Sequence, residues 1–106
     1  MAKFLVHGAY SVEGAKGLLK DGGSKRRSAI KDLIEKAGGR LESLYFAFGR
    51  DDFFLVVDLP DNATAAAVSL AVAASGAATA QTVVLMTPEE VDAATKKTVA
   101  YRPPGT

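Results

Sequence analysis

The chain has 106 residues, and its composition, 48% hydrophobic and 24% charged, is typical of one folded domain rather than of a disordered chain. Thirteen Lys and Arg against twelve Asp and Glu leave a net charge of +1, so the excess of positive charge that nucleic-acid binding uses is missing. Because the sequence has no Cys and a single His, we expect no disulfide, no metal site and no cofactor.

A strand and a loop are predicted at the start of the chain. Lys3 to Tyr10 holds a short run of bulky apolar residues bounded by a glycine, which predicts a strand with apolar groups on both faces. Ser11 to Gly23 contains four glycines. That density favours a long loop, in which a short turn of helix can form over Ala15 to Lys20.

A helix should follow this loop. Ser24 is suited to its N-cap, and apolar residues then repeat at helical spacing up to Ala37. Arg26 and Arg27 are expected on the side of this helix that faces water. The Gly38-Gly39 pair ends the helix, as a left-handed C-terminal cap would.

The middle of the chain predicts a β-hairpin. Arg40 to Phe48 is rich in aromatic and aliphatic residues and indicates the second strand. Gly49 to Asp52 has the composition of a turn, and Phe53 to Leu59 follows at once as the third strand. Because the turn between them is short, the two strands should pair antiparallel.

The last part of the chain predicts a helix, a strand and a short helix. Asp61 is suited to cap an alanine-rich helix that ends near Gly76. Thr79 to Met86 indicates the fourth strand. Thr87-Pro88-Glu89-Glu90 is the signature of a capping box, which predicts a short helix to about Lys97. We expect one domain over residues 1–98 and a frayed tail over residues 99–106.

The sequence favours a cytoplasmic location. The N-terminus carries neither a long apolar segment nor a cleavage-type ending, so we expect no signal peptide. Ala63 to Ala80 is apolar but consists mostly of alanine, which makes it a weak candidate for a membrane span. We therefore expect neither a membrane nor a nucleic acid as a partner.

The order of these elements, βαββαβ, predicts an α+β, ferredoxin-like fold. Right-handed connections place the first and third strands in the middle of a four-stranded antiparallel sheet, with both main helices on one face.

A sheet covered on one face should carry polar residues on the other, and these strands do not. The third strand places Phe53, Leu55, Val57 and Leu59 on one face, but Phe54 and Val56 on the other. The second strand divides into Leu44, Phe46 and Phe48 on one side and Leu41, Tyr45 and Ala47 on the other. We expect a second copy of the chain to cover this face, as a homodimer or higher homo-oligomer. The alternative is cover from the Ser11–Gly23 loop or from the last helix.

Several segments, in order, resemble the GYD-domain family: Ser11–Arg26, Gly38–Gly49, Asp52, Pro60-Asp61 and Leu85–Val91. The resemblance runs from about Tyr10 to Val91. It implies a small bacterial or archaeal protein without an assigned function, and a fold similar to the dimeric α+β barrel group. That group contains ligand-binding modules, isomerases and cofactor-free monooxygenases. The chain departs from the Gly-x-Tyr-Asp-like stretch that names the family, because Asp51 stands where a tyrosine is expected.

Two residues are candidates for acid–base chemistry. Asp52 begins the third strand on its less apolar side and could present a carboxylate to a pocket. Its alternative role is to accept backbone hydrogen bonds in the hairpin turn. His7 falls on the other central strand and could share a cavity with Asp52. Its alternative role is a hydrogen-bonded core or interface residue.

Five residues are candidates for ligand binding. Ser24 and Arg27 lie at the expected helix start, Gly22 to Arg27, where free N–H groups and three cations, Arg26 among them, can hold a phosphate or a carboxylate. Arg50, in the hairpin turn, is a further cation for an anionic ligand. Tyr10 and Tyr45 could donate phenol hydrogen bonds, although tyrosines also pack at interfaces.

Taken together, these features favour a homo-oligomeric small-molecule-binding or regulatory module. The alternatives are a cofactor-free enzyme of the isomerase or monooxygenase type, with His7 or Asp52 as the base, and a purely structural assembly subunit. The sequence leaves open whether the protein is an enzyme.

Overall fold

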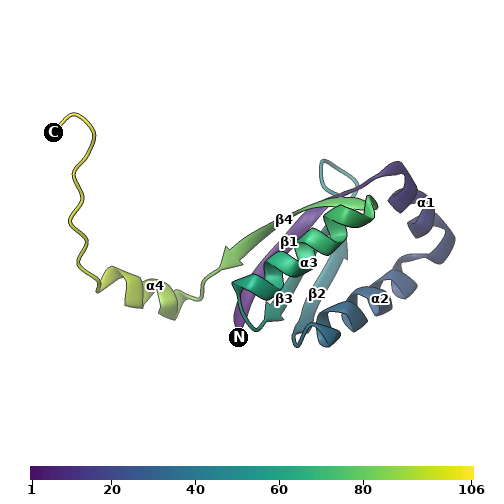
Figure 1. The fold of residues 1–106 in the computed structure, drawn as a ribbon, viewed down its shortest axis with the longest axis horizontal. Helices are drawn as coiled ribbons and strands as arrows, with labels where there is room; N and C mark the ends of the chain where they lie inside the picture. Colours follow the sequence, from purple (N-terminus) through teal and green to yellow (C-terminus); the bar gives the residue numbers. More distant parts are fainter.

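The computed structural model describes all 106 residues. Its elements follow in chain order as β1 (Ala2–Tyr10), α1 (Val12–Asp21), α2 (Gly23–Lys36), β2 (Arg40–Phe46), β3 (Phe53–Leu59), α3 (Asn62–Ser75), β4 (Ala78–Leu85) and α4 (Pro88–Thr95) (Figure 1). The strands form one antiparallel sheet in the order β2-β3-β1-β4. This confirms the α+β, ferredoxin-like prediction, including β1 and β3 as the central strands.

The core lies between the sheet and two helices, α2 and α3, which cover the same face (Figure 1). β3 contributes every second residue to it, and those four side chains are almost completely buried. The buried apolar residues are Phe4, Ile30, Ile34, Phe53, Leu55, Val57, Leu59, Ala65 and Ala78. Burial of this apolar surface is the main favourable contribution to folding.

Local signals set most of the helix ends. Asp61 caps α3 by accepting a hydrogen bond from the Thr64 backbone N–H at 2.8 Å. At the start of α4, Thr87 and Glu90 form the reciprocal hydrogen bonds of a capping box. Gly76, with φ of 72°, ends α3 in the left-handed conformation that glycine adopts without strain.

The prediction of a long loop over Ser11 to Gly23 is wrong, because most of this segment forms the helix α1, which includes the short helical turn expected over Ala15 to Lys20. Ser11 caps the helix, its Oγ accepting a hydrogen bond from the Gly14 N–H at 3.2 Å. Gly22, with φ of 81°, ends α1 and also precedes the first residue of α2. Ser24 is therefore the second residue of α2 and not its N-cap. The cap and the good helix formers outweigh the glycines.

Close backbone contact holds α1 against the start of β4. The Ser11 backbone N–H donates to the Ala77 carbonyl oxygen at 2.9 Å, and the Ser11 hydroxyl donates to the same oxygen at 3.1 Å. A Cβ atom on Gly14 would lie 2.0 Å from that oxygen. Only glycine at position 14 allows the helix to approach this closely.

The prediction for the second strand needs two corrections. β2 ends at Phe46, so Phe48 lies outside the strand and is 92% exposed. A β-bulge between Leu41 and Ser43 turns Leu41 toward the core, where it pairs with Val57, instead of toward the opposite face with Tyr45. An extra residue of this kind reverses the alternation of side chains, and the residue pattern alone does not reveal it.

The C-terminal part of the chain does not pack against the sheet or the other helices. α4 and the tail extend away from β4, and α4 makes no substantial contact with another element (Figure 1). α1 packs on α2 and β1. Neither segment therefore covers the second face of the sheet within the chain. None of the four helices combines the length and the hydropathy that crossing a bilayer requires.

The contact between α1 and Ala77 predicts opposite effects for two glycine substitutions. Gly14→Ala should lower the free energy of unfolding by about 1–3 kcal/mol, because the new methyl group overlaps a backbone oxygen. Gly17→Ala is the matched control: position 17 has no atom within 4 Å of the added Cβ, so helix propensity should raise that free energy by about 0.5–1 kcal/mol. Urea denaturation followed by circular dichroism measures both, and equal effects would contradict the packing described here.

Candidate functional site

The sheet face opposite α2 and α3 is called here the open face. The strand registers place on it Lys3, Leu5, His7 and Ala9 from β1; Arg40, Ser43 and Tyr45 from β2; Phe54, Val56 and Asp58 from β3; and Thr79, Gln81, Val83 and Leu85 from β4. Charged residues lie at one end of this face, apolar residues in the middle, and His7 toward the other end. The apolar middle confirms that both faces of the sheet carry apolar groups.

The charged end is a network of ion pairs across three strands. Lys3 Nζ lies 2.6 Å from Glu42 and 3.0 Å from Asp58, and Arg40 lies 3.1 Å from Asp58. The hydrogen bond from Lys3 holds the pKa of Asp58 below its ordinary value, and partial burial of the carboxylate opposes this effect. The hydrogen bonds to Glu42 and then to Asp58 raise the pKa of Lys3. The network therefore favours the charged form of both residues.

His7 is held by Asp51. The His7 Nδ1 atom lies 2.6 Å from Asp51 Oδ2, and the imidazole ring stacks on Phe54 with 5.8 Å between ring centres and 9° between planes. When Asp51 is ionised, Nδ1 donates and Nε2 becomes the accepting nitrogen. Both side chains are less than one-third exposed. This arrangement can take a proton from a ligand that lies on the open face.

Asp52 forms hydrogen bonds with the backbone instead of with His7. Its Oδ2 atom accepts a hydrogen bond from the Tyr10 N–H at 2.9 Å, and its own N–H donates to the Gly8 carbonyl oxygen at 2.7 Å. Asp52 thus joins the end of β1 to the hairpin, which agrees with its alternative role as a backbone acceptor. The structure brings His7 together with Asp51 and not with Asp52.

A cleft of about 570 Å³ opens between α1 and the end of the β2–β3 hairpin. We call it the outer cleft. Most of its walls are apolar, and Asp52 contributes a carboxylate. The lining residues are Tyr10, Ala15, Leu18, Leu19, Gly23, Phe46, Phe48 and Asp52. Leu19 and Phe48 are 87% and 92% exposed, so apolar walls of the cleft stand open to water.

Comparison with known protein families gives one match, to the model described as the GYD domain, over residues 4–95. The chain belongs to the GYD-domain family. Comparison with curated proteins and with solved structures finds no match. The family match confirms the resemblance drawn from the sequence and extends from β1 to the last turn of α4.

The ligand-binding candidates of this GYD domain do not converge on one site. Tyr10 lines the outer cleft, whereas Tyr45 and Arg27 line a separate hollow of about 630 Å³ between α2 and β2. Ser24 and Arg50 are exposed and line neither space. Ser24 and Arg27, expected together at a helix start, therefore do not line a common space, and the two tyrosines line different ones.

Sequence reasoning missed one functional candidate in the GYD domain, Asp51, and misplaced another, Arg26. In the sequence Asp51 stands out only as a departure from the family pattern, whereas the structure places its carboxylate 2.6 Å from His7 Nδ1. Arg26 is expected among the cations of the helix start and on the water-facing side of α2, whereas its Nε atom is buried and has no hydrogen-bond partner. No pattern in the sequence marks a cation whose long side chain turns back toward the core.

The lowered pKa of Asp58 predicts acid sensitivity. Because this pKa is lower in the folded chain than its ordinary 3.8, the ionised carboxylate stabilises the fold above that pH, and the stabilisation is lost as the pH falls through the folded value. Urea denaturation from about pH 7 to about pH 2 should therefore show a smaller acid loss in Asp58→Asn than in the unchanged chain. Asp92→Asn, at an exposed position on α4, should keep the full loss. Identical acid profiles for all three proteins would exclude a role for Asp58.

Proposed function

We propose that this GYD domain is a self-associating small-molecule-binding module. Two copies pair through their open faces, and each copy binds a ligand in its outer cleft. The observation that carries the proposal is the apolar middle of the open face, which no element of the chain covers.

The exposed apolar groups on this face support pairing. Leu5 lies between Val56 and Val83 on neighbouring strands, which makes an apolar row across three strands. Next to this row, Tyr45 is 72% and Phe54 is 37% exposed. A contiguous apolar patch on a sheet is uncommon on a monomer and marks an interaction surface.

The charges on the open face favour a second copy over a partner of one charge sign. Lys3 and Arg40 are cations and Glu42 and Asp58 are anions at one end of the face, while the anion Asp51 lies beside His7 toward the other end, so the face carries both signs. A two-fold symmetric interface brings the same patch together twice, and mixed charges can then meet their opposites. A strongly basic or acidic partner would find like charges to repel it.

The outer cleft supports ligand binding. Its volume of about 570 Å³ falls in the range of about 300–1,000 Å³ that small-molecule sites occupy. Apolar walls supply most of the contact area, while Asp52 and the phenol of Tyr10 offer polar groups that can orient a ligand.

A cofactor-free enzyme is the second candidate, favoured by the 2.6 Å contact between His7 and Asp51. Pairing through the open face would enclose this pair between two apolar surfaces, where a histidine base acts on an enolic or aromatic substrate without competition from water. Turnover in a substrate screen would favour this function over a binding role alone. The third class, an assembly subunit, requires neither turnover nor a bound ligand.

Pairing through the open face predicts that one charge will separate the copies. Val56→Lys places an ammonium group in the middle of the apolar row and should convert a dimer at micromolar concentration into a monomer. Leu70→Lys is the control, since Leu70 is 70% exposed on α3, away from the open face. Light scattering gives the mass, and circular dichroism checks that both variants fold. A monomeric unchanged protein, or a dimeric Val56→Lys variant, would contradict the interface.

Ligand binding in the outer cleft predicts that a bulky residue in its wall will block it. Ala15→Trp places an indole in the cleft, whereas Lys16→Trp adds the same group at the next, exposed position, which does not line the cleft. In native mass spectrometry after exposure to a metabolite library, the unchanged chain and Lys16→Trp should retain a compound that Ala15→Trp loses. Retention of the same compound by all three proteins would place the site elsewhere, and no retained compound at all would argue against a binding function.

A further inference from the structure

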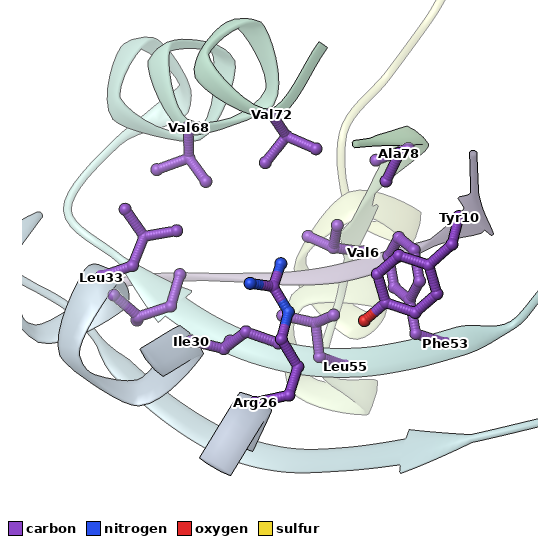
Figure 2. Close-up of a pocket in the computed structure, with 12 residues that line it drawn as sticks. Val6, Tyr10, Arg26, Ile30, Leu33, Phe53, Leu55, Val68, Val72 and Ala78 are labelled. Carbon is purple, nitrogen blue, oxygen red and sulfur yellow. The ribbon is translucent and has the colours of Figure 1, made fainter. Parts of the chain in front are cut away.

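A second, smaller cavity lies inside the sandwich, in the space between α2 and α3 (Figure 2). The two helices make little contact with each other, which leaves a space between them. The sheet closes this space on one side. Its volume is about 50 Å³, and 11 of the 12 residues that line it are hydrophobic. Val6 and Leu55 come from the sheet, Ile30 from α2, and Val68 and Val72 from α3. We call it the inner cavity.

The one charged group that lines the inner cavity is Arg26. Its side chain rises from α2 and turns its guanidinium group toward the space below Val68 and Val72 (Figure 2). The Nε atom is buried and has no hydrogen-bond partner. The only contact of note is with the Tyr10 ring, whose centre lies 5.9 Å from the guanidinium carbon.

No carboxylate of the chain neutralises this guanidinium. Glu13 and Asp21 line a hollow of about 180 Å³ on the other side of Arg26, but each is paired with a lysine of its own. Glu13 lies 3.9 Å from Lys16, and Asp21 lies 3.6 Å from Lys25. A guanidinium that is partly withdrawn from water and lacks an acceptor costs free energy, which an anion that accepts its hydrogen bonds would recover.

A second unused donor lies beside the first. The Tyr10 hydroxyl forms no hydrogen bond within the chain, and Figure 2 shows its ring on the same cavity as Arg26. A guanidinium and a phenol that converge on one apolar space match a planar anion with two oxygens. A water molecule could accept from either donor but would leave the positive charge without a counter-ion.

We propose that the inner cavity binds a small carboxylate with a short apolar tail. The carboxylate oxygens accept hydrogen bonds from Arg26 and from the Tyr10 hydroxyl, while the tail lies against Val68 and Val72. A cavity of about 50 Å³ holds a few carbon atoms, which limits the tail to a short acyl chain. This site goes beyond the outer cleft, which lies on the other side of Tyr10, and it requires no second copy of the chain.

The test compares butyrate with butan-1-ol, which has the same tail without the charge. Isothermal titration should show saturable binding of butyrate and none of the alcohol. Arg26→Met, which keeps an unbranched apolar stem and removes the guanidinium and its charge, should weaken butyrate binding by about tenfold or more. Lys31→Met is the control, because Lys31 is an exposed cation of the same helix and does not line the cavity; it should bind butyrate as the unchanged chain does.

Methyl NMR on the unchanged chain locates the ligand without any substitution. Butyrate should shift the methyl resonances of Val68 and Val72 and leave those of Val83, on the open face, in place. The proposal is overturned if Arg26→Met and the unchanged chain bind butyrate equally, if only the Val83 resonances move, or if phosphate and chloride shift the Val68 and Val72 methyls as strongly as butyrate does. Absence of binding by butyrate, propionate and acetate alike would also overturn it. None of these outcomes depends on the oligomeric state or on the outer cleft.

Discussion

Removal of apolar surface from water on both sides of one sheet is the constraint on which the rest of this structure depends. β3 supplies Phe53, Leu55, Val57 and Leu59 to the covered side, where α2 and α3 shield them almost completely. Its other side supplies Phe54 and Val56, for which the chain provides no cover. A monomer can satisfy the first requirement alone. The self-association proposed here follows from the second, and it would bring the His7–Asp51 pair into an enclosed space.

The candidate sites gather at the end of the sandwich where β1 stops, because α1 is fixed there. Ser11 and Gly14 hold α1 against the Ala77 carbonyl, and Asp52 joins the hairpin to the Tyr10 backbone. Tyr10 therefore lies at a fixed position between the outer cleft and the inner cavity. This one tyrosine separates two apolar spaces of different size, so a substitution at α1 that moves it would affect both.

The sequence predicted the elements whose signals are local. The hairpin, the Asp61 cap and the capping box at Thr87 depend on residues within a few positions of each other, and they were found where expected. α1 was not predicted as a full helix because a high density of glycine argues against a helix. The reason for glycine at position 14 is its close approach to the Ala77 carbonyl oxygen, which is far along the chain. The β-bulge after Leu41, the pairing of His7 with Asp51 and the inward turn of Arg26 all depend on tertiary register, which periodicity does not encode.

The detached α4 gives the molecule an elongated outline of 56 × 33 × 23 Å. Its radius of gyration is 16.9 Å, compared with about 13 Å for a compact domain of this length. A single copy therefore has a larger hydrodynamic radius than a compact domain of the same mass. It would leave a gel-filtration column early, at an elution volume similar to that of a compact dimer. Elution volume and translational diffusion report the length of this arm as much as the number of chains, so they are poor guides to stoichiometry for this protein.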